Sequence, residues 1–334
     1  MRRGAVGALV AGSLLVTGCA SATDEDTTAG GDDKTAAAET AFPVTLDNCG
    51  FDVVMESEPE RIVLVNNDGL SNLEALGVVD RIVGLTQKPQ EGVFLDETYD
   101  ALESSNLLSA EIKDGGGSVV SVESVLAVEP DLVFAPDSAV DRAALEAAGI
   151  AMFSPSAFCE DLPEAYQAGA SFDLVWDEVR SYGALVGESA LAEEIIADAE
   201  DVIEQAVPEE QLGKGAAIYV SASGVLWLYG SGSMVTPVFD AVGLSNVYSD
   251  ESERVFEVTA EDLIARDPET VVLLYSMDNE QDVIDMFAEN PAVAELSAVT
   301  SGRIVTLPFH FTDPPSILTA RGPAALATKL AELE

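Results

Sequence analysis

The chain contains few of the side chains that usually carry out catalysis. Its only histidine is His310, so a serine or cysteine hydrolase would have to use this residue as its base. No Gly-x-Ser-x-Gly sequence is present, and Gly230-x-Gly232 has Val235 where a dinucleotide-binding loop needs a third glycine. One imidazole is also too few for a typical bare zinc or manganese site. We therefore expect no enzyme, no cofactor and no metal site.

The first residues have the three parts of a bacterial export signal. Arg2 and Arg3 precede an apolar stretch that runs from about Ala5 to Val16 and ends at Cys19. A membrane-spanning helix needs about 20 apolar residues, so this stretch is too short to be one. Residues 16–19, Val-Thr-Gly-Cys, resemble a lipobox, which predicts a signal peptide over residues 1–18 and a lipidated Cys19. The alternative is an ordinary signal peptide with an incidental cysteine.

Residues 19–41 are rich in Thr, Ala, Gly and Asp and have too little apolar content to pack. Such a composition is typical of a flexible, self-repelling coil. We expect a tether that lets the folded part extend from a lipid anchor on the extracytoplasmic face of the cell membrane.

The charge of the chain argues against a nucleic-acid partner. Sixty acidic residues face 15 basic ones, for a net charge of −45, and the basic residues are scattered, whereas nucleic-acid binding needs them clustered. A negative field favours neutral or cationic ligands. The simpler alternative is a solvated surface that suits a salty exterior.

Two cysteines remain when Cys19 is assigned to lipidation. Cys49 and Cys159 form an even pair in a chain predicted to work in an oxidising compartment, so we predict a disulfide between them. Two free thiols or a metal-binding pair remain the alternatives.

Apolar runs and helical patterns alternate along the chain. Buried strands are expected at 61–65, 81–85, 131–135 and 150–153, with helices at 71–77, 121–128 and 139–148 between them. This alternation predicts an α/β fold with a parallel sheet covered on both faces. Strands at 216–220, 271–275 and 303–307 form a second set. The sequence thus predicts an N-terminal lobe at 42–172 and a C-terminal lobe at 208–334.

Residues 173–207 lie between the two lobes and contain no proline. Their apolar positions recur at three- and four-residue spacing, which predicts one long linking helix. Gly183 and Gly187 weaken this prediction, since a glycine inside a helix costs about 1 kcal/mol relative to alanine.

The two lobes contain related segments. Residues 121–133 align without a gap with residues 259–271. Both segments begin with a hydroxyl residue suited to capping a helix, continue with an early acidic residue, and reach a proline just before a strand. The alignment predicts two similar α/β units, although chance recurrence of a common helix-to-strand connection is the alternative.

Several segments carry a resemblance to a known family. They are Pro59-Glu60-Arg61-Ile62-Val63, residues 74–84 (Glu-Ala-Leu-Gly-Val-Val-Asp-Arg-Ile-Val-Gly), the Ser-x-Glu to Pro-Asp-Leu-Val-Phe unit, and Gly243-Leu244-Ser245-Asn246-Val247. In this order they resemble the solute-binding lipoproteins of bacterial ABC importers that carry iron-siderophore, haem or cobalamin. The resemblance covers nearly the whole chain after Phe42.

This resemblance implies two Rossmann-like lobes with parallel sheets, joined by one long α-helix, with a ligand held in the cleft between them. It also implies a monomer that delivers its ligand to the permease subunits of an ABC importer. Acidic side chains on each lobe would dock on the permease, and Glu74 and Asp240 occupy suitable positions.

Ligands of open α/β sheets bind beyond the carboxyl ends of the strands. In the N-terminal lobe this rule selects polar residues at three strand ends: Asn66, Asn67, Asp68, Thr86, Gln87, Lys88, Asp137 and Ser138. In the C-terminal lobe it selects Tyr275, Ser276, Phe309 and His310. Trp227 and Tyr229 add aromatic faces beside the glycine-rich turn that contains Ser231.

The resemblance suggests an iron-siderophore or a related metal chelate as the ligand. Siderophore binders commonly use arginines against anionic chelates, and this chain has few at its strand ends. A neutral or cationic hydroxamate chelate, or a corrinoid such as cobalamin packed on Trp227, Tyr229 and Phe309, therefore suits the charge better, and haem is a further alternative. A surface sensor or adhesion lipoprotein with the same fold is the alternative from another functional class.

Overall fold

The computed structural model describes residues 40–112, 117–206, 211–220, 225–276 and 280–333. The predicted signal peptide, Cys19 and the tether up to residue 39 lie outside these residues. Thr40, at the end of the predicted tether, already contacts the folded chain, because the backbone N–H of Ser189 donates to its Oγ1 at 3.1 Å. Among the described residues, no helix combines the length and the apolar character needed to cross a bilayer.

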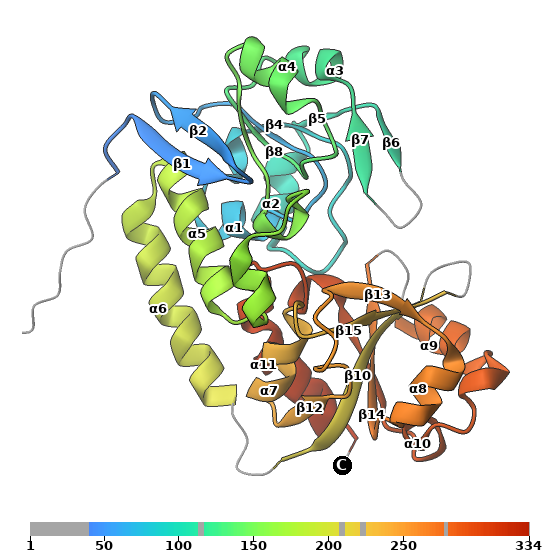
Figure 1. Ribbon diagram of the computed structural model, residues 1–334. Helices are drawn as coiled ribbons and strands as arrows, with labels where there is room; N and C mark the ends of the chain where they lie inside the picture. The colour runs from blue at the N-terminus through green and yellow to red at the C-terminus, as the bar shows by residue number, and fades with distance from the viewer. Residues whose placement is uncertain (1–39, 113–116, 207–210, 221–224, 277–279, 334) are drawn as a thin grey trace, which may run out of the picture. The chain divides into compact units, whose positions relative to one another are not determined.

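The N-terminal lobe is built on a five-stranded sheet with the order β5-β4-β3-β8-β9, in which every neighbouring pair is parallel (Figure 1). Its strands are β3 (Ile62–Leu64), β4 (Ile82–Leu85), β5 (Asn106–Leu107), β8 (Leu132–Phe134) and β9 (Ala151–Phe153). All residues of β3 and β8 are buried. Continuous apolar runs are typical of parallel strands covered on both faces, so the predicted sheet is confirmed.

The remaining elements of this lobe are short. Its helices are α1 (Leu70–Ala75), α2 (Asp96–Leu102), α3 (Val122–Leu126) and α4 (Arg142–Ala147), with the 3₁₀ helices η1 (Val79–Arg81), η2 (Ser156–Phe158) and η3 (Glu164–Ala168). Two antiparallel hairpins are added, β1 (Val44–Asn48) with β2 (Phe51–Met55), and β6 (Ala110–Ile112) with β7 (Ser118–Val120). The alternation of apolar runs and helical patterns did not predict either hairpin.

The prediction of one unbroken helix over residues 173–207 is wrong. The structure has two helices, α5 (Asp173–Val186) and α6 (Ser189–Ala206), which pack side by side as a hairpin (Figure 1). Gly187 ends α5 because it adopts a left-handed conformation with φ of +89°, which favours glycine. Gly183 permits close packing, since a Cβ there would lie 2.6 Å from the Cβ of Ala192. The long helix that leads to the second lobe is therefore α6 alone.

The C-terminal lobe contains a six-stranded sheet: β10 (Gly213–Val220), β11 (Leu226–Tyr229), β12 (Leu244–Asn246), β13 (Val255–Val258), β14 (Thr270–Tyr275) and β15 (Ile304–Pro308). Its helices are α7 (Val235–Ala241), α8 (Ala260–Arg266), α9 (Glu280–Ala288), α10 (Ser297–Thr300) and α11 (Ile317–Ala331), with η4 (Pro291–Val293) and η5 (Phe309–Phe311).

This second sheet is mixed, which corrects the prediction of a parallel sheet in both lobes. Strands β12, β10, β14 and β15 are parallel, but β11 is antiparallel to both β10 and β13. The cause is the short connection between β10 and β11, because a parallel crossover needs a dozen or more residues. The exact division into domains at residues 172 and 208 stays a prediction.

The two aligned segments have the same local structure. Ser121 caps α3 by accepting the N–H of Ser124, and Thr259 caps α8 by accepting the N–H of Asp262. In each unit the residue before the proline has positive φ, 48° in Glu129 and 42° in Asp267. These residues occupy equivalent positions in the aligned segments.

The end of the chain returns to the N-terminal lobe. Helix α11 packs against α6, α5 and α1, and Ile317 and Leu318 belong to the same buried apolar cluster as Leu70 and Leu73 of α1. The buried side chain of Asn72 fixes this contact, because its Oδ1 accepts the backbone N–H of Ile317 at 2.9 Å. The two lobes therefore meet in a packed region beside the linking helices.

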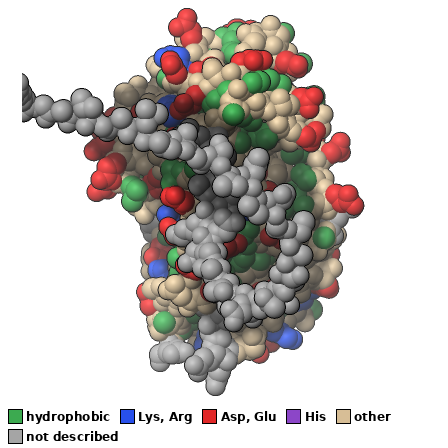
Figure 2. Space-filling model, turned by 90° about the vertical axis from the view of Figure 1, so that its left-hand side faces the viewer, with side chains coloured by type: hydrophobic (Ala, Val, Ile, Leu, Met, Phe, Trp, Pro, Cys, Tyr) green, Lys and Arg blue, Asp and Glu red, His purple; other side chains and the backbone are tan. Residues whose placement is uncertain are grey.

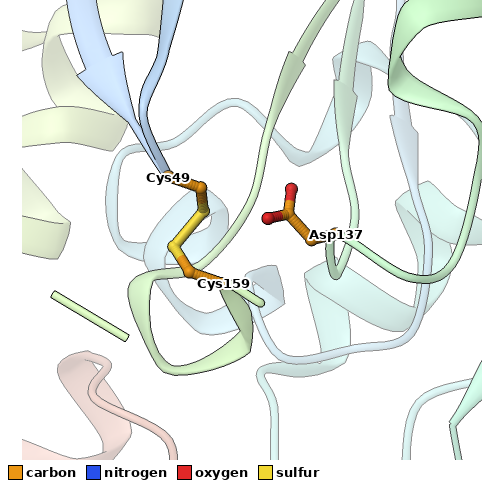
Figure 3. A group of neighbouring side chains, drawn as sticks. All are labelled: Cys49, Asp137 and Cys159. Carbon is orange, nitrogen blue, oxygen red and sulfur yellow. A yellow bond between two sulfur atoms is a disulfide. The ribbon is translucent and has the colours of Figure 1, made fainter. Parts of the chain in front are cut away.

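The predicted disulfide between Cys49 and Cys159 is confirmed (Figure 3). It joins the turn of the β1–β2 hairpin to the residue that follows η2, across a sequence separation of 110 residues. Asp137 lies beside it, with its carboxylate turned toward the two sulfur atoms. The disulfide therefore ties the start of the folded chain to a long loop of the N-terminal lobe.

Removal of this disulfide should destabilise the protein strongly. For a loop of about 110 residues, the chain-entropy model predicts a loss of about 5 kcal/mol in the free energy of unfolding. We expect the double variant Cys49→Ser/Cys159→Ser to unfold at lower denaturant concentration than the wild type. Dithiothreitol should shift the wild type to the same midpoint and leave the double variant unchanged. Equal midpoints for the oxidised wild type and the double variant would contradict the prediction.

Candidate functional site

A cavity of about 970 Å³ lies between the two lobes. We call it the inter-lobe cavity. It is lined by Ala157, Cys159, Glu160, Asp161, Leu162 and Tyr166 of the N-terminal lobe and by Gly232, Ser252, Glu253, Arg254 and Val255 of the C-terminal lobe. Its volume lies near the upper end of the range for small-molecule sites, about 300–1,000 Å³.

A second cavity, of about 670 Å³, belongs to the C-terminal lobe alone. It is lined by Gln211, Leu212, Gly213, Glu269, Ser297, Thr300, Ser301 and Arg303. These residues surround the starts of β10, β14 and β15, whereas ligands of parallel sheets bind at the opposite ends. We therefore place the candidate site in the inter-lobe cavity.

The N-terminal wall of the cavity is the irregular segment that contains η2 and η3. The disulfide holds this segment at Cys159, and Asp137 holds the next residue by accepting the N–H of Glu160 at 3.3 Å. Asp137 is itself paired with Arg142 at 2.6 Å. The hydroxyl of Tyr166 lies 2.9 Å from Oγ of Ser156. These contacts fix a loop that has little regular hydrogen bonding of its own.

The C-terminal wall is formed by two segments that pack very closely. The N–H of Ser231 donates to the carbonyl of Glu251 at 2.7 Å, and that of Gly230 to the carbonyl of Arg254 at 3.3 Å. Neither glycine of this wall has room for a side chain. A Cβ on Gly230 would lie 2.4 Å from the carbonyl oxygen of Glu251, and a Cβ on Gly232 would lie 2.7 Å from that of Ser252. The Gly-Ser-Gly sequence therefore permits close backbone packing and is not a nucleotide-binding loop.

Arg254 is the one basic residue among the described residues that line the inter-lobe cavity. Its guanidinium forms an ion pair with Asp313, whose side chain is fully buried, and lies 5.2 Å from the centre of the Phe158 ring. Asp313 also accepts a hydrogen bond from the hydroxyl of Ser233 at 3.2 Å. Because Asp313 neutralises Arg254, the guanidinium is poorly placed to bind an anionic ligand.

Two carboxyl groups, those of Asp68 and Asp313, lie close to this arginine, and a third, that of Glu178, lies near Tyr166. Burial raises the pKa of Asp68 to about 6, although the nearby Arg254 opposes the shift. Burial also raises the pKa of Asp313, again against the effect of Arg254. Burial raises the pKa of Glu178 on α5 to about 7, even though the N–H of Ser156 donates to its Oε1. Its Oε2 has no hydrogen-bond partner within the described part of the protein.

The rim of the inter-lobe cavity is acidic. Glu160, Asp161 and Glu253 are exposed there, and Leu162, which is 41% exposed, adds an apolar surface. Acidic side chains are also scattered over the face shown in Figure 2, with few basic ones among them. The charge around the cavity therefore favours a neutral or cationic ligand.

None of the ligand-binding residues predicted from the strand ends is among those that line this cavity. In the N-terminal lobe, Asn66, Thr86 and Gln87 bond to one another. Oδ1 of Asn66 accepts from Gln87 and from the N–H of Ser118, and the N–H of Asn66 donates to Thr86. The amide of Asn67 donates to the carbonyl of Lys88, Asp137 is paired with Arg142, and Ser138 and Lys88 are exposed.

The predicted residues of the C-terminal lobe form an aromatic group. The ring of Phe309 lies 6.3 Å from that of Tyr229 and 5.8 Å from that of His310. Burial lowers the pKa of His310 to about 4, so this side chain is neutral at pH 7. Ser276 lies within hydrogen-bond distance of the Tyr219 hydroxyl, Ser231 donates to the carbonyl of Glu251, and Trp227 and Tyr275 are half-buried.

The two residues predicted to dock on a partner differ in their surroundings. Glu74 accepts hydrogen bonds from the N–H of Leu95 and the hydroxyl of Thr98, which stabilises the start of α2. Asp240, at the end of α7, is exposed. Asp240 is thus the freer of the two to meet a partner.

The strand-end rule missed the residues that form the cavity. Arg254 precedes β13, which is antiparallel to β11, so the rule for parallel strands does not apply to it. Tyr166 and Leu162 lie in an irregular segment without a periodic pattern. The rarity of basic residues could have pointed to Arg254, because the chain has only 15 of them against 60 acidic residues.

The buried carboxyls predict that stability falls as the pH rises. A carboxyl with a raised pKa in the folded state stabilises the protein below its unfolded pKa and loses that contribution as the pH rises through the folded value. For Glu178 this window runs from about 4.5 to 7. We expect Glu178→Gln to raise the free energy of unfolding at pH 8 by about 1–3 kcal/mol and to flatten its dependence between pH 5 and 8.

The exposed neighbour Asp177 provides the control, since Asp177→Asn removes a carboxyl from the same turn of α5, and Asp177 raises the pKa of Glu178 less than burial does. Urea unfolding at several pH values measures the effect. Equal pH profiles for the wild type and Glu178→Gln would show that the prediction is wrong.

Two curated proteins and one solved structure are similar to this chain over most of its length. A cobalamin-binding protein of Halobacterium salinarum is 26% identical over 285 residues, which cover 83% of this chain and 71% of that protein. An uncharacterised ABC transporter substrate-binding lipoprotein of Bacillus subtilis is 24% identical over 282 residues, which cover 81% of this chain and 80% of that protein. The crystal structure of an ABC-type Fe³⁺-hydroxamate transport system from Saccharomonospora viridis superposes with a TM-score of 0.78. It is 32% identical and covers 88% of this chain and 99% of that chain.

The sequence profile of a protein family described as "Periplasmic binding protein" matches residues 62–310. The matched region runs from β3 of the first sheet to η5 and so includes both sheets and the segments that line the inter-lobe cavity. Proteins of this family and the similar proteins described above are solute-binding proteins and not enzymes. The chain therefore belongs to the periplasmic binding protein family.

Proposed function

We propose that this protein captures a neutral or cationic ferric hydroxamate chelate outside the cytoplasm and delivers it to the permease of an ABC importer. The observation that carries the proposal is the inter-lobe cavity, which is large, has walls from both lobes and has an acidic rim. A bulky chelate would be enclosed between the two walls.

The charges around the cavity support this ligand class over an anionic catecholate or citrate complex. The acidic residues Glu160, Asp161 and Glu253 lie at its rim, and its one arginine is already paired with Asp313. An anionic chelate would meet like charges without an available basic side chain. A protonated amine on a hydroxamate chelate would instead meet carboxylates.

The similar proteins support the same class. The structure with 32% identity is described as part of an Fe³⁺-hydroxamate transport system. A second candidate is a corrinoid, because one curated relative is described as a cobalamin-binding protein. In that case Leu162 and Tyr166 would supply apolar contacts to the macrocycle.

The predicted anchor suits delivery to a membrane protein. Lipidation at Cys19 would hold the mature chain on the outer face of the cell membrane, and the tether at 19–41 would let the lobes reach the permease. The Bacillus subtilis relative is described as a lipoprotein of this kind. We propose Asp240 and Glu74 as docking residues. The hydrogen bonds from Leu95 and Thr98 both go to Oε2 of Glu74.

Ligand binding can be tested through the two tryptophans, Trp176 and Trp227. The full-length protein would be titrated with ferrioxamine B, a ferric catecholate, haem and cyanocobalamin while the fluorescence is recorded. We expect saturable quenching by ferrioxamine B with a dissociation constant of about 1 µM or lower. Saturation by cyanocobalamin alone would favour the second candidate, and no change with any probe would contradict both.

The acidic rim should determine the preference for a cationic chelate. We expect the double variant Glu160→Gln/Glu253→Gln to bind ferrioxamine B roughly two- to fivefold more weakly, since exposed charges contribute modestly. Glu257→Gln is the matched control, because Glu257 is exposed on β13 and does not line the cavity. Equal affinities for the double variant and the control would remove the electrostatic argument.

A further inference from the structure

We propose that Arg254 is a positioning residue that holds the two walls of the inter-lobe cavity together. Its guanidinium lies among groups that come from different parts of the chain and balances their negative charge. The effect of Arg254 on the contact between the walls can be tested without a ligand. Only the expected effect on ligand affinity rests on the proposed function.

The contacts of Arg254 span both lobes. It lies in the C-terminal lobe, just before β13, and forms an ion pair with Asp313, which precedes α11. From the N-terminal lobe, the Phe158 ring packs against the guanidinium at 5.2 Å, and the Asp68 carboxyl interacts with it electrostatically. One side chain thus interacts with three separate segments.

The backbone of Arg254 is connected through residues 230 and 231 to a hydrogen bond between the lobes. The carbonyl of Arg254 accepts the N–H of Gly230. Ser231 follows Gly230 in the chain, and its carbonyl accepts the N–H of Ala170 in the N-terminal lobe at 2.7 Å. Gly232 leaves no space between the two segments of the wall, since a Cβ there would lie 3.3 Å from the backbone nitrogen of Arg254. A displacement of Arg254 would therefore disturb the bond between Ser231 and Ala170.

The charges in this region make the role of Arg254 dependent on pH. The titratable and charged groups that interact with Arg254 or with its carboxyl partners are Asp68, Tyr166, Tyr182, Tyr229 and Asp313. Glu178 lies one step further away, next to Tyr166 and Tyr182. Burial raises the pKa values of the three phenols, so they are neutral near pH 7. Without the guanidinium, the Asp68 and Asp313 carboxyls would repel each other whenever both are ionised.

Hydrogen exchange of the Ala170 amide gives the most direct test. We expect Arg254→Met to lower its protection by about tenfold or more at pH 7.5, because the inter-lobe bond opens more often. Arg303→Met is the matched control. It removes the same charge from the C-terminal lobe, where the Arg303 side chain donates to the hydroxyl of Thr270, and it should leave Ala170 protected as in the wild type.

Two further measurements separate charge balance from simple loss of packing. Adding Asp68→Asn to Arg254→Met should restore much of the protection, because the facing carboxyl is gone. Lowering the pH to 5.5 should shrink the difference between Arg254→Met and the wild type, after correction for intrinsic exchange rates. A purely structural role would respond to neither change, and that result would overturn the proposal.

Arg254→Lys keeps the charge but has no planar group to bridge several partners, so we expect intermediate protection of Ala170. If Arg254→Met does not fold, Arg254→Lys provides the test. Protection of the Ala170 amide in Arg254→Lys equal to that in the wild type would contradict the proposal. A weaker affinity of Arg254→Met for ferrioxamine B with unchanged Ala170 protection would also overturn it, because Arg254 would then contact the ligand directly. Failure of the wild type to bind any probe would refute the proposed function, while the exchange data would still decide this inference.

Discussion

One guanidinium balances the buried negative charge between the lobes. Arg254 is paired with the fully buried Asp313 and lies close to Asp68, in a chain whose net charge is −45. Removing a buried ion's partner leaves an uncompensated charge that costs several kcal/mol. We infer that the close packing of residues 230–232 against residues 251–254, and with it the shape of the cavity, depends on the position of this arginine.

A second constraint comes from how the chain passes between the lobes. Helix α6 leads into the second sheet, and α11 returns to pack against α6, α5 and α1. The bond from Ile317 to Asn72 is buried in this region. Because the connection is helical and packed on more than one side, we expect the two walls to move relative to each other by small hinge motions only. The cavity is then largely preformed, which reduces the conformational entropy lost on binding.

Much of the fold was predictable because its signals are local. The apolar runs of β3, β8 and β14, the capped starts of α3 and α8, and the pairing of Cys49 with Cys159 all follow from residue type and spacing. The break between α5 and α6 could not be inferred from periodicity, because a glycine in a helical pattern can either continue the helix or end it. At Gly187 the left-handed conformation decided the outcome.

The site was harder to predict than the fold. Several residues chosen at strand ends, such as Asn66, Thr86 and Gln87, bond to one another, whereas the cavity is lined by irregular segments whose positions depend on long-range contacts. Crystals grown with ferrioxamine B would test the central claim most directly, through the anomalous signal of iron. The account predicts an iron peak between Tyr166 and Arg254. A peak in the cavity around Arg303, or none in crystals of the saturated protein, would contradict it.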